Sequence, residues 1–447
     1  MMLEKTSLYN EVLAIGSKGG RNTYRMTAEL YYGTTMISVY RVRALHTFAD
    51  FETSYNEEIE IDLAISEGVY NQQVIPNVDQ LKLNVFITTL APNVPRTTKK
   101  FTYRAFPKTQ TDAKLTTNRA SELNQQVIAN TSMEVYRFQL FCEAIEQLRT
   151  QQTGGKFFVT TTETLCKTLL GGVSEGLQLP LEVRPLGMQM AASDTSVVKN
   201  VIEVQQGLAL CDLPGYLQEH YGVYNAGIGY FYHAQYWYVW PLYNTKRFEL
   251  VKDNLVVVNV PQDKFPSIEH TFELRGSTLC VLATGESKLA DNSNQIQYNQ
   301  GNGSRAAKAS SVLNEGVSVN AGTVLLQRSV TNNEFVTASR RNGVDNAPTV
   351  SQVTDNTCKL LSRTAHAAGS VVQVTWENAD MTLISPDMPA RYLYLKDGVV
   401  AQRYGVLLRT EAHYRLGADG MTNDLMLCDG ALTLFIDNAD ETANTSL

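Results

Sequence analysis

The chain has 447 residues, of which 43% are hydrophobic and 19% charged, a composition typical of a folded protein with several domains. Lys and Arg number 38 against 45 Asp and Glu, so the formal net charge is −7, the wrong sign for a protein that wraps nucleic acid. The longest apolar runs, such as LVVVNV at 255–260, are far shorter than the roughly 20 residues of a membrane-spanning helix and predict buried strands. The N-terminal stretch MMLEKTSLYNEVLAIG lacks an uninterrupted apolar segment, so we expect no export signal.

Cysteines and histidines are dispersed along the chain. The six cysteines form no CxxC, and the six histidines form no HxxxH or HExxH. This spacing predicts neither a disulfide framework nor a metal site, and no cofactor is implied. Each cysteine is expected to be a small buried hydrophobe in a reducing compartment.

Strands dominate the first hundred residues. The stretch TAELYYGTTMISVYRVRALHTF at 27–48 and the stretch EEIEIDLAISEGVY at 57–70 both alternate in side-chain character. In the second, the isoleucines and Leu63 share one face and Glu58, Glu60 and Asp62 share the other, which predicts a half-buried strand with an acidic outer face. Pro76 and Asp79 predict a turn before another strand, LKLNVFITTLAP.

Three short helices are predicted in the middle of the chain. In residues 131–154, Thr131 and Glu134 fit a capping box, and an apolar stripe runs from Val135 to Ile145, so this segment is the strongest helix candidate. TTTETLCKTLLGG repeats the pattern with Thr160, Glu163 and Gly171. DLPGYLQEHYG at 212–222 has Asp212 as a cap and Pro214 in the first turn. The remainder, from 245 to 436, returns to strands and turns.

Catalytic motifs are weak. GVSEG at 172–176 matches the GxSxG pattern around Ser174, but a nucleophile elbow needs a strand before the serine, and here a helix precedes it. GGK at 154–156 lacks the Ser or Thr that follows the lysine of a phosphate loop. Carboxylate pairs such as Asp437 and Asp440 are more simply explained as part of a solvated face than as the catalytic pair of a glycosidase. We therefore expect no enzyme and assign no catalytic residue.

One aromatic cluster stands out. YFYHAQYWYVWPLYN at 230–244 holds two of the three tryptophans, and the polar triplet HAQ at 233–235 predicts a hairpin. Both faces of its second strand are apolar, and the nearest basic residues come only after the strand, which disfavours base stacking. We expect inner packing, with Tyr232, Tyr236, Tyr238 and Trp240 at a packing surface or a subunit interface.

Residues 30–90, 212–262 and 383–436 resemble the central baseplate hub proteins of contractile-tailed bacteriophages, a family related to the base of type VI secretion spikes. The matching stretches are the strand order ending in IPNVDQLKLNV, the helix LPGYLQEHYGVYNAGIGYFY running into YWYVWPLYNTKRFE, and LISPDMPARYLYLKDGVVAQRYGVLL. The insertion near residue 300 has no counterpart in the family.

The resemblance implies two tail-tube-like β-barrels in one chain. Three copies would then form a pseudo-sixfold ring that adapts the sixfold tail tube to a trimeric spike around the DNA exit channel. The implied partners of this homotrimer are the tail tube protein, the spike and surrounding baseplate proteins. DNA would pass without specific binding, and the chain would be a virion protein assembled in the host cytoplasm.

The sequence predicts a mainly β fold with a small α/β helical middle portion. The expected organisation is an N-terminal tube-like β-domain at 1–105, a mixed domain with short helices at 106–228, a β-hairpin region at 229–289, a polar loop or insertion at 290–311, a C-terminal β-domain at 312–436 and an acidic tail at 437–447. Two alternatives remain: a carbohydrate-binding or fibre-attachment tail protein that uses exposed Trp237 or Trp240, and a hydrolase built around Ser174.

Overall fold

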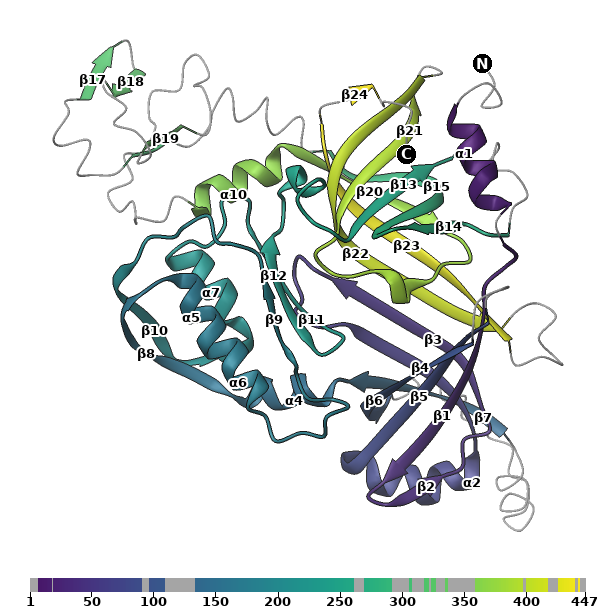
Figure 1. The fold of residues 1–447 in the computed structure, drawn as a ribbon. Coiled ribbons are helices and arrows are strands. Elements are labelled where there is room, and N and C mark those ends of the chain that lie inside the picture. The colour runs from purple at the N-terminus through teal and green to yellow at the C-terminus, as the bar shows by residue number, and fades with distance from the viewer. Residues whose placement is uncertain are drawn as a thin grey trace.

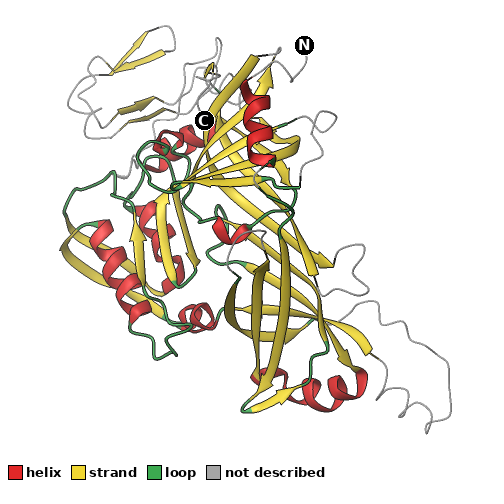
Figure 2. Cartoon of the chain, turned by 45° about the vertical axis from the view of Figure 1, so that its right-hand side comes forward, coloured by secondary structure: helices red, strands yellow, loops and turns green. Residues whose placement is uncertain are grey.

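Two long antiparallel strands near the C-terminus, β22 (Val399–Leu416) and β23 (Leu425–Asp437), organise the fold, as seen in the computed structural model (Figure 1). The structure describes residues 7–17, 19–90, 96–108, 133–260, 269–291, 305–307, 317–320, 323–326, 334–336, 358–396, 399–416, 425–438 and 441–442. Within these residues the fold is mainly β, as predicted, with helices both in one inserted part and outside it (Figure 2).

The N-terminal strands close a circuit of pairings through β22 and β23. They are β1 (Thr23–Tyr32), β2 (Thr35–Ile37), β3 (Arg41–Asp50), β4 (Glu58–Ser66), β5 (Leu81–Leu90), β6 (Thr97–Pro107) and β7 (Met133–Phe141), with helical turns at α2 (Glu67–Val69), Tyr70–Val74 and Ile75–Gln80. The antiparallel pairings run from β22 through β3, β4, β7, β6, β5 and β1 to β23 and back to β22. Strands at opposite ends of the sequence are therefore neighbours.

A second circuit forms on the other part of β22 and β23. It uses β13 (Asn254–Asn259), β15 (Thr278–Asp291), β20 (Gly369–Trp376) and β21 (Pro389–Lys396), with β14 (Phe272–Arg275) at an edge and β24 (Glu441–Thr442) beside β22. Pairings run from β22 through β21, β13, β15 and β20 to β23, and β13 is parallel to both of its neighbours. Both faces of β13 are buried, as the apolar run LVVVNV predicted.

A smaller α/β part is inserted between β7 and β13 and lies to one side of both circuits (Figure 1). It contains α4 (Glu143–Thr150), β8 (Gln152–Thr160), α5 (Thr162–Cys166), α6 (Gly172–Glu175), β9 (Gly187–Met190), β10 (Lys199–Ala209), α7 (Leu213–His220), β11 (Ile228–His233) and β12 (Tyr236–Pro241), with helical turns at Lys167–Gly171, Leu210–Asp212 and Thr245–Arg247. Here β8 pairs with β10, and β9, β11 and β12 form a separate three-stranded sheet.

The remaining elements are peripheral. They are α1 (Ser7–Gly16), α10 (Cys358–Ala367), a helical turn at Met381–Leu383 and two short two-stranded sheets, β16 (Arg305–Ala307) with β19 (Glu334–Val336) and β17 (Val317–Asn320) with β18 (Thr323–Leu326). Val12 and Ile15 of α1 pack on Val256 and Val258, so α1 covers the second face of β13.

Three apolar cores account for the arrangement. The largest fills the two circuits and includes Trp376, Phe138 and Leu434. The second lies inside the inserted part, between its helices and the three-stranded sheet. The third is the small cluster beneath α1. In β4, Ile59, Ile61, Leu63 and Ile65 face the largest core, as their alternation predicted.

The helix predicted over residues 131–154 is wrong for its first half. Met133–Phe141 is strand β7, and a helix, α4, begins only at Glu143. The same residues also alternate, since Phe138 and Leu140 are buried while Arg137 is exposed. Pairing with β4 on one side and β6 on the other satisfies the backbone of this segment, and that long-range gain overrides the local helical stripe.

The helix predicted at TTTETLCKTLLGG is confirmed, with different ends. The Thr161 side chain, not that of Thr160, accepts a hydrogen bond from the Thr164 amide. Gly171 does not end the helix, because its backbone is right-handed and the helical path continues to Glu175. The helix at LPGYLQEH is confirmed as α7, although the Asp212 side chain makes no capping hydrogen bond.

The segment predicted as a polar loop at 290–311 begins in the last residues of β15 and includes β16; its other residues lie outside the described ones. Only part of the predicted acidic tail is described, and it includes β24. The predicted turn at Pro76 is a helical turn that leads directly into β5. The division into domains stays a prediction, although β6 continues past residue 105 and β7 joins the N-terminal strands.

Candidate functional site

Ser174, the centre of the GxSxG match, is buried near the end of α6. Its Oγ accepts a hydrogen bond of 3.0 Å from Trp237 Nε1, and the residue is 1% exposed. A nucleophile needs a neighbouring base and access for substrate. Ser174 instead serves as the acceptor that satisfies a buried indole, which explains why a serine follows a helical turn here.

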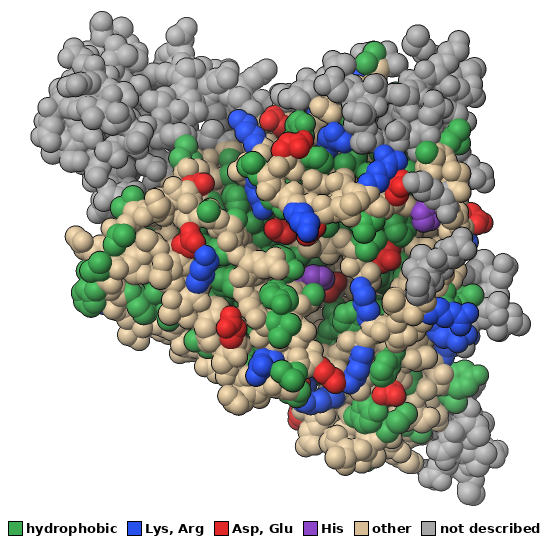
Figure 3. Space-filling view, viewed as in Figure 1, with side chains coloured by type: hydrophobic (Ala, Val, Ile, Leu, Met, Phe, Trp, Pro, Cys, Tyr) green, Lys and Arg blue, Asp and Glu red, His purple; other side chains and the backbone are tan. Residues whose placement is uncertain are grey.

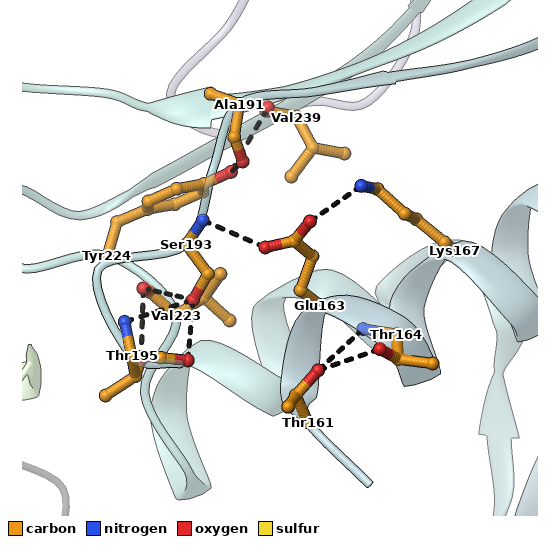
Figure 4. A network of polar contacts seen from close by, with 10 residues as sticks. All are labelled: Thr161, Glu163, Thr164, Lys167, Ala191, Ser193, Thr195, Val223, Tyr224 and Val239. Carbon is orange, nitrogen blue, oxygen red and sulfur yellow. Dashed lines mark hydrogen bonds and ion pairs between the residues drawn. The ribbon is translucent and has the colours of Figure 1, made fainter. Parts of the chain in front are cut away.

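The polar network on the preceding helix, α5, is also structural. Glu163 accepts a hydrogen bond from the Ser193 amide and forms an ion pair with Lys167 Nζ at 2.6 Å (Figure 4). The Lys167 ammonium lowers the pKa of Glu163. In the same network, Tyr224 and Thr195 donate to backbone carbonyls. These contacts fasten the 191–196 segment to α5 and leave the carboxylate paired, so we assign no acid or base role to Glu163.

The aromatic stretch forms the predicted hairpin. β11 and β12 pair in register from Ile228 with Pro241 to His233 with Tyr236, and Ala234 and Gln235 make the turn with φ of 47° and 69°. Two positive φ values in a two-residue turn match the twist of the flanking strands. Gly229 is required opposite Trp240, because a Cβ there would lie 2.6 Å from the indole ring. The hairpin turn therefore falls within the HAQ triplet at 233–235, as predicted.

The two faces of β12 enter different cores. Trp240 belongs to the large core with Phe51 and Phe231, whereas Trp237 belongs to the core of the inserted part with Tyr232. Trp237 and Trp240 are 0% and 1% exposed. The hairpin is thus the layer that joins the inserted part to the two circuits. An exposed tryptophan platform, which the carbohydrate-binding alternative requires, is absent from this stretch.

The four predicted contact residues are divided between these environments. Tyr232 is buried, Tyr238 is half-buried against the large core, and Tyr236 is half-buried beside β9. Burial raises the pKa of Tyr238. A role of these tyrosines at a subunit interface stays a prediction.

The outer face of the N-terminal circuit carries the second cluster of interest, here called the seam face: His46 on β3, Glu60 and Asp62 on β4, Arg137 on β7, and Glu411, His413 and Arg415 on β22 with Asp429 on β23. All of these residues except Glu411 line a hollow of about 510 Å³. The strands beneath are antiparallel neighbours, so alternate residues of each strand point to this face while Leu45 and Tyr414 point to the core.

Charges on the seam face are paired across strands. Arg137 binds Asp62 through two hydrogen bonds of 2.8 and 3.1 Å, and Arg415 binds Asp429 at 2.5 Å. Lys108 binds Glu60. Two of the three carboxylates of the acidic outer face predicted for β4, Glu60 and Asp62, are therefore paired with basic side chains from β7 and from Lys108, which follows β6. On the face of the molecule shown in Figure 3, acidic and basic groups are likewise interspersed.

Glu411 differs from these carboxylates because its partners are imidazoles. Its Oε1 lies 3.1 Å from His46 Nε2 and 2.9 Å from His413 Nε2, and the two rings stack at 4.2 Å. Burial by itself raises the pKa of Glu411, but the hydrogen bonds from both histidines outweigh it and leave that pKa below its ordinary value. All three ligand atoms lie within 4.8 Å of one another.

Sequence reasoning missed this cluster, because metal motifs were sought at helical spacing. Glu411 and His413 are two residues apart, which places them on one face of a strand. That spacing is the only local signal. His46 is 365 residues from Glu411 and joins the pair only through the pairing of β3 with β22.

No protein-family model matches the chain. No curated protein matches it either. Among the described residues, no helix is long and apolar enough to cross a membrane.

Solved structures similar to the chain include a PdpA-VgrG complex, a type VI secretion component and a prophage tail protein. A PdpA-VgrG complex matches with a TM-score of 0.40 and 7% identity over 93% of this chain, which spans 65% of that longer chain. The E. coli c3393 protein, described as a type VI secretion component similar to T4 tail proteins gp27 and gp5, matches with a TM-score of 0.40 and 8% identity over 92% of this chain and 77% of its own.

A 43 kDa tail protein of prophage MuSo2 from Shewanella oneidensis matches with a TM-score of 0.43 and 6% identity over 92% of this chain and 98% of its own. Two of these three proteins are therefore named as a type VI secretion component and as a prophage tail protein.

Proposed function

We propose that this chain is a structural, ring-forming hub of a phage tail baseplate, which adapts a sixfold tail tube to a trimeric spike. The observation that carries the proposal is the pair of closed pairing circuits that share β22 and β23. Two such circuits in one chain supply two tube-like modules per subunit. Three subunits then present six modules upward and a threefold surface downward.

Rigid coupling of the two modules supports this role. β22 and β23 run through both circuits as continuous strands, so a load on one circuit passes to the other along the backbone. The large core is likewise continuous through both circuits. An adaptor between two symmetric assemblies needs its modules held at a fixed angle, and shared strands provide that coupling without a hinge.

The inserted part offers a surface for subunit contact. Phe158 and Val159 on β8 are 67% and 75% exposed, and Val201 on β10 is 42% exposed. Among the described strands, β8 and β10 pair only with each other. Exposed apolar side chains beside unpaired strand edges are suited to a neighbouring protein chain, and a closed ring of copies would cover them.

The alternatives receive less support. A glycan platform needs exposed aromatic rings, and Trp237 and Trp240 are buried. A hydrolase needs a free nucleophile, and Ser174 accepts a hydrogen bond from Trp237 in a buried position. The carboxylates of the seam face are paired with Lys, Arg or His side chains.

The decisive experiment is the subunit stoichiometry, measured by native mass spectrometry on the purified chain and by image reconstruction of assembled tails. We expect a species of three times the 49.7 kDa chain mass and a threefold density at the tube tip. A chain that stays monomeric at micromolar concentration and contributes no threefold ring in tails would contradict the proposal.

A charge introduced on β8 locates the contact within that trimer. Phe158→Asp should lower the trimer fraction, because a carboxylate would enter an apolar contact. Leu250→Asp is the matched control, since Leu250 is 81% exposed and lies outside the β8–β10 sheet. If both variants stay trimeric, the subunit contact lies elsewhere, and the hub proposal is judged on stoichiometry alone.

Passage of DNA sets a further requirement. A ring on the DNA path should lack a continuous Lys and Arg lining, because phosphates would bind it. The mixed charges of the seam face fit this requirement. Tight DNA binding by the assembled ring that weakens steeply with salt would argue against a place on the exit channel.

A further inference from the structure

The seam face contains three side-chain donors that converge on one point. His46 Nε2 and His413 Nε2 lie 3.1 and 2.9 Å from the same oxygen, Glu411 Oε1. A tetrahedral ion bound at about 2.0–2.1 Å has its donor atoms about 3.4 Å apart. These two separations are within about half an ångström of that value, and the two imidazole nitrogens lie within 4.8 Å of each other. Two imidazoles and one carboxylate are also a donor set that zinc accepts.

We propose that His46, Glu411 and His413 form a site for a divalent transition metal ion of the zinc class. Glu411 would bind through Oε1, and each histidine through Nε2. A fourth position would stay open to water, since three protein ligands leave one tetrahedral site unfilled. This site lies outside the hub function and does not depend on it.

Backbone pairing preorganises the three donors. His46 and His413 are direct partners across β3 and β22, and Glu411 lies two residues from His413 on the same face. The sheet therefore fixes the spacing of the Cα atoms before any ion arrives. Metal binding then requires only rotation of side chains. The two rings stack with planes that differ by 14°, and they must turn so that both Nε2 lone pairs point to the ion. Side-chain exposures of 34% for His46 and 55% for His413 leave room for that rotation.

Neighbouring charges favour this carboxylate over the others. Glu60, Asp62 and Asp429 are already bound by Lys108, Arg137 and Arg415. Glu411 is the seam-face carboxylate whose described partners are both imidazoles, which are metal ligands when neutral. An ion there replaces the two contacts between Glu411 and the histidines with three coordination bonds, and it leaves the ion pairs of Lys108, Arg137 and Arg415 intact.

Its position gives the ion a structural consequence. β3 joins β22 over seven residue pairs, from Arg409 with Asp50 to Arg415 with Ala44, whereas β1 joins β23 over only two. The β3–β22 ladder is therefore the main closure of the N-terminal circuit. A metal ion bound by His46 and His413 would link strands from opposite ends of the sequence and oppose opening of this circuit.

The test is metal titration of the tag-free full chain after treatment with a chelator. Co²⁺ is added while its visible absorption is followed, and Zn²⁺ is then added as competitor; thermal unfolding is recorded with and without Zn²⁺. We expect one equivalent of Co²⁺ to give a four- or five-coordinate spectrum that Zn²⁺ displaces, with a rise in Tm because the ion binds the folded state. His46→Gln should weaken Zn²⁺ binding at least about 100-fold. Mutation of residues that only hydrogen-bond to a metal ligand already lowers metal affinity roughly 10–100-fold.

Two further variants complete the design. Glu411→Gln keeps a hydrogen-bonding side chain but removes the anionic ligand, and should weaken binding to a similar degree. His220→Gln, which changes an exposed histidine of α7 away from the seam face, should leave both the spectrum and the Tm shift unchanged. Circular dichroism confirms that each variant is folded.

Absence of a stoichiometric cobalt spectrum in the unmodified chain would overturn the proposal. Equal loss of binding in His220→Gln and His46→Gln would also overturn it, because the ion would then be held nonspecifically by surface histidines. Retention of full affinity by both His46→Gln and Glu411→Gln would place any bound ion at another site.

Discussion

The aromatic hairpin and the seam face show two ways in which strands of one protein use their faces. β12 buries both of its faces, each in a different core, and its tryptophans are 0% and 1% exposed. β3 and β22 bury one face and carry paired charges and imidazoles on the other. The hairpin therefore joins the inserted part to the two circuits by burying apolar area. The seam face instead carries ion pairs and imidazoles that are partly exposed to solvent and add little stability.

Removal of the Trp240 side chain is expected to have the largest effect. Trp240→Ala should lower the free energy of unfolding by about 3–5 kcal/mol, because it leaves a cavity between β12 and Phe51. The measurement is urea denaturation followed by circular dichroism. Phe158→Ala is the control: that ring is 67% exposed, so its loss should cost less than about 0.5 kcal/mol. If both variants lost a similar amount of unfolding free energy, the hairpin would contribute no more to stability than an exposed side chain does.

Ser174→Ala tests the other face of the hairpin. The change removes the acceptor of Trp237 Nε1 and leaves a buried N–H without that partner, so we expect a loss of about 1–3 kcal/mol. Assembly and every other measured property of the particle should be unchanged. Loss of an ester or peptide hydrolysis activity on this change, with stability intact, would favour the hydrolase alternative.

Glu57 lies between the two regions, in the segment that connects β3 to β4 past the hairpin. Desolvation raises its pKa from 4.5 to about 7, although a hydrogen bond from Thr47 opposes the shift. The folded state therefore holds a proton that the unfolded state loses first. Stability should be highest below pH 4.5 with respect to this group and should fall as the pH rises towards about 7.

Glu57→Gln removes that titration. At pH 8 the variant should be more stable than the unmodified chain by roughly 1–2 kcal/mol, a value that allows for partial exposure of the side chain. The difference should disappear near pH 4. Denaturation curves at several pH values measure it, and parallel pH profiles for the two proteins would show that Glu57 ionises normally.

The smallest effect is expected on the seam face. A double-mutant cycle of Arg137→Ala and Asp62→Ala should give a coupling energy of about 0.2–1 kcal/mol, because Arg137 is half-exposed and the pair is screened by solvent. The coupling should shrink in high salt. A coupling above about 2 kcal/mol would mean that the seam face contributes to stability on the scale of the hairpin.

The sequence by itself determined the features that depend on neighbours in the chain. The alternation of β4, the buried run of β13, the two-residue turn at Ala234 and Gln235 and the helix α7 are all local patterns, and each is present. Such patterns are visible because one face or one turn is set by residues a few positions apart.

Only the tertiary structure decided the features that depend on distant partners. Residues 133–141 form a strand because β4 and β6 supply backbone partners that no local pattern reveals. Glu60 and Asp62 on the acidic face of β4 are paired with Lys108 and Arg137 from elsewhere in the chain. The imidazole pair forms because β3 and β22 lie side by side. The pairing of strands more than 350 residues apart depends on which faces are buried in the whole core.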